Sequence, residues 1–110
     1  MRVLVRQLAV HQLLYSAEKF NRLVFGSQVN VLRGLNEHGS LSELAIIPVY
    51  EKAKLDYPSV YSGYSFENWI GFLLTQGVVR RDANNYQITA FGQYFLSWLV
   101  HNNVSVIKAN

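Results

Sequence analysis

A β-hairpin followed directly by a helix is predicted over residues 77–99, GVVRRDANNYQITAFGQYFLSWL. VVRR and YQIT are strand candidates, and the Asp and Asn residues of DANN between them tolerate the geometry of a turn. Thr89 stands where its side chain can cap a helix over residues 90–101. This stretch indicates the α+β fold class.

The rest of the chain is mostly helical by pattern. A long first helix is predicted over residues 2–24, where apolar residues lie on more than one side of a helical projection with no Gly or Pro among them. Ser27 is a candidate N-cap of a second helix, which we expect to end at Gly39. Ser65 is a candidate cap of a helix over residues 66–76.

Another helix is predicted between the last two, over residues 42–54. Its cap is Ser40 or Ser42, and Pro48 is expected to kink it or divide it in two because proline removes a backbone donor. Residues 55–64 contain a Pro and a Gly and are predicted to form a loop.

At 110 residues the chain is expected to be one domain, since a second core would need roughly twice the length. Residues 1–26 would form the first helix, 27–101 the core and 102–110 a tail. The sequence contains no cysteine, which excludes disulfides, thiolate metal sites and a cysteine nucleophile.

The first twenty residues raise the question of a targeting or membrane segment. Arg6, Gln7, His11 and Gln12 interrupt their apolar run, which is also too short to span a bilayer. We therefore expect a helix of the folded domain, no membrane partner and, by default, a cytoplasmic protein.

The order of three helices, a hairpin and a closing helix resembles the winged helix-turn-helix superfamily over about residues 27–100. The motifs that carry the resemblance are the Gly before VVRR, the Tyr-x-Ile-Thr strand and the Gly-x-x-Phe-Leu helix. The resemblance implies that residues 66–76 form a recognition helix and that residues 82–85 form the tip of the wing.

Double-stranded DNA is the first partner that the resemblance implies. On the predicted recognition helix, Asn68 and Thr75 could read base edges, and the wing could contribute Arg80, Arg81, Asn84 and Asn85. Glu67 would repel phosphate, and no Lys or Arg lies between Lys54 and Arg80. Formal net charge is a modest +3.

A protein partner is the alternative. A helical projection places Trp69 on the core face of the helix over residues 66–76 and Phe72 off it, beside Gly71. Phe72, together with Tyr57, Tyr61 and Tyr64, could anchor a partner, or these tyrosines could simply cover the core with their hydroxyls in water.

The terminal helices predict a homodimer. The closing helix spreads its apolar residues, Tyr94 and Trp98 among them, over an arc wider than one core requires, and the first helix adds Leu4 and Leu8. Two copies would bury this surface. Alternatively, the first helix wraps the closing helix within one chain.

No constellation of catalytic residues is apparent. The three histidines are far apart, none has a metal ligand at a suitable spacing, and there is no paired carboxylate or glycine-rich phosphate loop. We therefore expect no enzyme, no cofactor and no metal. The leading hypothesis is a winged-helix DNA-binding protein with the role of a transcriptional regulator, and the alternative is a protein-interaction or assembly module that does not bind DNA.

Overall fold

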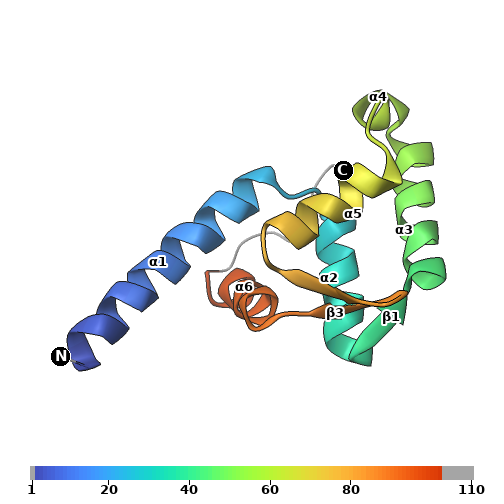
Figure 1. Ribbon diagram of the computed structural model, residues 1–110. Helices are drawn as coiled ribbons and strands as arrows, with labels where there is room; N and C mark the ends of the chain where they lie inside the picture. Colours follow the sequence, from blue (N-terminus) through green and yellow to red (C-terminus); the bar gives the residue numbers. More distant parts are fainter. Residues whose placement is uncertain (1, 103–110) are drawn as a thin grey trace.

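The predicted hairpin forms, and a third strand that the sequence pattern did not predict joins it (Figure 1). The computed structural model describes the backbone of residues 2–102 and the side chains of residues 12–102. In this part of the chain, six helices accompany one small antiparallel sheet, in the order α1 (Arg2–Leu23), α2 (Gly26–His38), β1 (Ser40–Ser42), α3 (Glu43–Asp56), α4 (Pro58–Tyr61), α5 (Phe66–Thr75), β2 (Val79–Asp82), β3 (Asn85–Ile88) and α6 (Ala90–His101). This is a mostly helical α+β fold with a C-terminal hairpin followed by a helix, as expected.

The sheet has the strand order β1-β3-β2, so β3 is its middle strand. Tyr86 of β3 lies opposite Leu41 of β1 and Arg81 of β2, and Tyr86 is buried. Because successive residues of a strand point to opposite faces, Leu41, Arg81 and Tyr86 face the core side. Arg80 and its partner Gln87 lie on the open side.

The turn of the hairpin is tied to the body of the protein. It consists of two residues, Ala83 and Asn84, and Ala83 adopts the left-handed conformation with φ 56°. The backbone N–H of Glu43, the first residue of α3, donates a hydrogen bond to the Asn84 carbonyl at 3.0 Å. The hairpin therefore does not stand free of the helices.

Three of the predicted helix caps are confirmed. The side chains of Ser42, Ser65 and Thr89 each accept a hydrogen bond from the backbone N–H three residues further on, at 3.1 to 3.2 Å. Gly39 and Gly77 follow α2 and α5 with positive φ angles of 84° and 77°. These are the left-handed positions that a glycine adopts without strain, which explains why the two helices end there.

Other local predictions are corrected by the structure. Ser27 is not an N-cap, because α2 already begins at Gly26 and Ser27 is buried. Pro48 lies inside α3, at its sixth residue, and does not divide the helix in two. Residues 55–64 are not all loop, because α3 continues to Asp56 and α4 follows.

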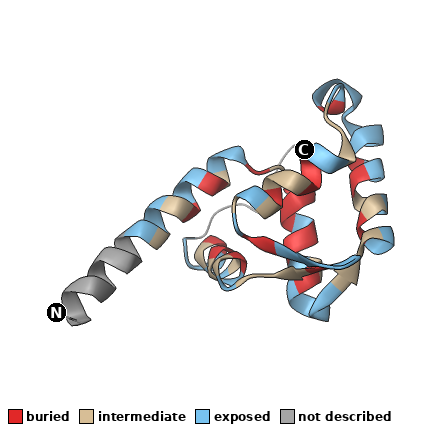
Figure 2. Cartoon of the chain, in the orientation of Figure 1, coloured by how far each residue is buried: buried red, intermediate tan, exposed pale blue. Residues whose placement is uncertain are grey.

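The core is built around α2, which contacts α3, α5, α6 and the strands β1 and β3 (Figure 2). From α5, Trp69, Ile70 and Leu73 enter this core, and Trp69 is fully buried, as the helical projection predicts. From α6, Phe95 and Leu99 are buried against it.

α1 joins the body through its C-terminal half. Among its described side chains, Ala17 and Phe20 are fully buried, and the helix contacts α6. Figure 1 shows that its N-terminal half extends away from the other helices. No helix in the described part of the chain is both long and apolar enough to cross a bilayer.

Candidate binding surface

Arg80 and Arg81, the two cations of the hairpin, point to opposite faces of the sheet. On the open face, the Arg80 Nε donates a hydrogen bond to the Gln87 side-chain oxygen at 2.8 Å. This partner is neutral, and the guanidinium remains exposed. Only the Nε–H is engaged, so the terminal N–H groups of Arg80 remain available to an anionic ligand.

Arg81 is engaged by its own chain. Its Nε donates to the Ala83 carbonyl at 2.8 Å, its guanidinium lies 5.5 Å from the centre of the Tyr86 ring, and Glu43 is 4.0 Å away. The Tyr86 hydroxyl donates to the same Glu43 carboxylate at 3.0 Å. Burial raises the pKa of Tyr86, and the hydrogen bond to Glu43 and the charge of Glu43 raise it further. This cluster holds the hairpin against α3.

The tip of the hairpin exposes Asp82, Asn84 and Asn85. Asp82 lies directly opposite Asn85 in the strand register. Its carboxylate offsets part of the positive charge of the two arginines beside it. The tip is polar and accessible, but it is not a concentrated patch of cations.

The outer face of α5 is the other surface that the winged-helix resemblance points to. Asn68 and Thr75 are exposed there, and so is Glu67. The helix itself contains no Lys or Arg. A surface with one carboxylate and no cation is poorly suited to a phosphate backbone, because phosphate contacts depend on accumulated positive charge.

Phe72 is not off the core face, contrary to the helical projection. Its ring stacks on that of Phe20 from α1, with the ring centres 5.8 Å apart and the planes 11° apart, and it is half-buried against the core. The projection of α5 alone could not show this, since the covering ring comes from a helix some fifty residues earlier in the chain.

Most of the tyrosines near α4 make hydrogen bonds inside the protein. Tyr61 is buried with its hydroxyl 2.7 Å from that of Ser27, and Tyr64 accepts a hydrogen bond from the Gln28 side chain at 3.3 Å. Tyr50 donates to the Tyr64 carbonyl at 2.6 Å. Burial is the main cause that raises the pKa of both Tyr50 and Tyr64. Tyr57 is exposed.

The structure describes only some of the side chains predicted for a dimer interface. The side chains of Leu4 and Leu8 lie outside the described residues. Tyr94 and Trp98 of α6 are half-buried, and Trp98 stacks on Phe95 with the ring centres 5.9 Å apart. On α1, Leu14, Tyr15 and Leu23 are 39%, 62% and 49% exposed, so this helix retains uncovered apolar surface.

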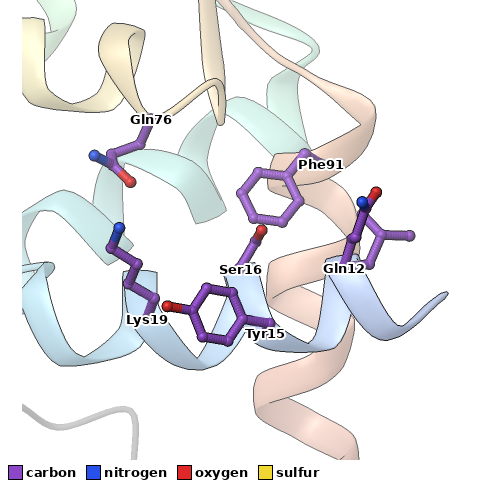
Figure 3. A pocket seen from close by; sticks show the side chains of 7 residues that line it. Gln12, Tyr15, Ser16, Lys19, Gln76 and Phe91 are labelled. Atoms are coloured by element: carbon purple, nitrogen blue, oxygen red, sulfur yellow. The ribbon is translucent and has the colours of Figure 1, made fainter. Parts of the chain in front are cut away.

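A groove between α1 and the α5–α6 side of the body was not predicted (Figure 3). Its volume is about 560 Å³, and five of its seven lining residues come from α1. Gln76, which follows α5, and Phe91, in the first turn of α6, line the facing side. Sequence reasoning missed this site because its residues are distant in the chain and form no motif.

Among the described residues, no three His, Asp or Glu side chains lie close enough together to hold a metal ion. His38 and His101 are the last residues of α2 and α6, and the His11 side chain lies outside the described residues. Comparisons of this chain with protein-family models, with curated proteins and with solved structures find no match.

Proposed function

We propose that this chain is a non-catalytic winged-helix module that acts in protein assembly and pairs with a second copy of itself through α1. The order of elements from α2 to β3 supports the winged-helix assignment: four helices, of which α4 has only four residues, then a hairpin with β1 alongside it. The poor fit of the α5 face to DNA, with Glu67 and no cation, favours a protein partner over a nucleic acid.

The observation that carries the proposal is the extension of α1 away from the body (Figure 1). This helix has 22 residues and would be about 33 Å long. Residues 2–11, RVLVRQLAVH, include six apolar residues. A helix that is apolar on more than one side needs a covering surface. A second copy of α1 supplies one of matching length and composition.

Packing within one chain does not account for the whole helix. Ala17 and Phe20 are covered by the body, whereas Leu14 and Tyr15 lie on other sides of the helix and are exposed. The contacts within one chain therefore leave apolar surface of α1 uncovered. A two-fold pair is the commonest arrangement by which a small protein buries such a surface.

Analytical ultracentrifugation from 1 to 100 μM tests this proposal. We expect a species of twice the mass of one chain. The double change Leu4→Glu and Leu8→Glu should give a monomer with an unchanged circular dichroism spectrum. Arg2→Gln with Arg6→Gln makes the same change in formal charge on the opposite side of α1 and should leave the dimer intact. A wild-type monomer that persists at the highest concentration would overturn the proposal.

DNA binding is the second candidate, favoured by the exposed Arg80 guanidinium on the open face of the hairpin. Asn68, Thr75, Asn84 and Asn85 are exposed as well. If this surface binds DNA, Arg80→Ala should weaken binding to a random 20-base-pair duplex and reduce the slope of log affinity against log salt by about 1. Arg33→Ala, on α2, is the matched control. An absence of salt-dependent affinity in the wild-type protein would reject this candidate.

A further inference from the structure

The groove of Figure 3 combines one positive charge with a polar and an aromatic lining. Lys19 is the one ionised side chain among its seven lining residues, and no carboxylate lines it. In the described part of the chain, the ion pairs are Lys52 with Asp56 and Arg81 with Glu43, so the Lys19 ammonium has no carboxylate partner there. The groove therefore offers an uncompensated cation.

The remaining lining separates into two regions. Figure 3 shows the Lys19 ammonium and the Gln76 amide directed toward the same opening, with the Tyr15 hydroxyl near Lys19. The Phe91 ring supplies apolar surface further along the groove. Leu13 is also among the lining residues. One end thus combines the positive charge of Lys19 with polar groups, and the other combines the flat Phe91 ring with the polar side chains of Gln12 and Ser16.

We propose that this groove binds a small organic anion, with a carboxylate at Lys19 and Gln76 and an aromatic body against Phe91 and Leu13. A volume of about 560 Å³ is within the usual range for small-molecule sites. Near Lys19, α1 carries one further cation, Arg22, and one carboxylate, Glu18. Lys19 would repel a cationic ligand, and the lining contains no carboxylate that could offset this repulsion.

Such a ligand would contact α1, the end of α5 and the start of α6 at once. It would add contacts at the junction where α1 leaves the body. We therefore expect ligand binding to raise the melting temperature. The groove is formed within one chain, so this inference does not depend on dimerisation or on DNA binding.

Isothermal titration calorimetry with three probes tests the proposal: 2-naphthoate, the neutral 2-naphthamide and the cationic 2-naphthylmethylamine. We expect 2-naphthoate to bind at least tenfold more tightly than the other two. Lys19→Met should remove this preference, and Lys19→Arg should retain it. Arg22→Met, which removes a cation one turn further along α1 but outside the groove, should change the affinity less than twofold.

Three results would overturn the proposal: no binding of 2-naphthoate at millimolar concentration, equal affinity for the acid and the amide, or unchanged affinity in Lys19→Met. Amide chemical shifts locate the ligand, and changes confined to residues outside Lys19, Gln76 and Phe91 would also contradict the assigned site. The Leu4→Glu, Leu8→Glu variant should bind 2-naphthoate as the wild type does, which separates this outcome from the test of the dimer.

Discussion

The hydroxyl oxygen of Ser27 lies 2.7 Å from the hydroxyl oxygen of Tyr61 in the interior of the protein. The same Ser27 oxygen accepts a hydrogen bond from the indole N–H of Trp69 at 3.1 Å. Next to it, the buried Gln28 side chain donates to the Trp69 carbonyl and accepts from the Phe25 backbone N–H, both at 2.9 Å. These contacts connect the start of α2 to α4 and α5.

We expect Ser27→Ala to lower the free energy of unfolding by about 1–3 kcal/mol, because the change leaves the buried Trp69 indole N–H without its acceptor. Urea denaturation followed by tryptophan fluorescence measures this loss. Ser62→Ala, at an exposed position between α4 and α5, is the control and should change the stability by less than about 0.5 kcal/mol. Equal effects of the two changes would argue against the buried network.

Two helical glycines should respond in opposite directions to alanine. A Cβ at Gly92 would collide with the Val78 carbonyl and would lie 2.6 Å from the Ile88 Cγ1, whereas a Cβ at Gly71 would meet no atom within 4 Å. Gly92→Ala is therefore expected to destabilise the protein by about 1–3 kcal/mol or more through overpacking. Gly71→Ala should stabilise it by up to about 1 kcal/mol through helix propensity. Thermal denaturation of both variants tests the pair, and a stabilised Gly92→Ala would contradict the close approach of α6 to Val78 and β3.

Phe72 is expected to contribute to stability through its stacking on Phe20. We predict that Phe72→Ala lowers the free energy of unfolding by about 2 kcal/mol, since its ring is only half-buried, against about 3–5 kcal/mol for Trp69→Ala. Thr75→Ala, on the exposed side of α5, is the control. Chemical denaturation distinguishes these variants, and a neutral Phe72→Ala would mean that α1 does not pack on α5 as described.

Stability should fall in alkaline solution as the buried tyrosines lose their protons. Burial and Glu43 raise the pKa of Tyr86, so near its ordinary pKa of about 10 the folded protein retains a proton that the unfolded chain releases. The contribution of Tyr86 is complete below pH 10 and is lost as the pH rises through the higher pKa of the folded state. Denaturation between pH 8 and 11.5 should show a smaller loss of stability for Tyr86→Phe and for Glu43→Gln than for the wild type. Identical slopes would contradict the assignment.

Signals that act within three or four residues were sufficient to predict much of the fold. The turn residues between the two strands, the caps at Ser42, Ser65 and Thr89 and the glycines that follow α2 and α5 act on their own backbone neighbourhood. A cap needs one side chain and one N–H in the next turn, so its partner is visible in the sequence. The alternation of side chains along a strand is also a local rule, and it places Arg80 and Arg81 on opposite faces of the sheet.

Partners far apart in the chain determined the rest. β1 forms because it pairs with β3, with Leu41 opposite Tyr86. Ser27 is buried against Tyr61 and Trp69, its hydrogen-bond partners, which lie 34 and 42 residues further along the chain. The helical period identified Trp69 as a core residue but misplaced Phe72. The period describes a single helix, whereas Phe72 is covered by the Phe20 ring of another helix, α1. The groove beside Lys19 has the same origin, because its lining comes from α1, Gln76 and Phe91 and forms only when these segments pack together.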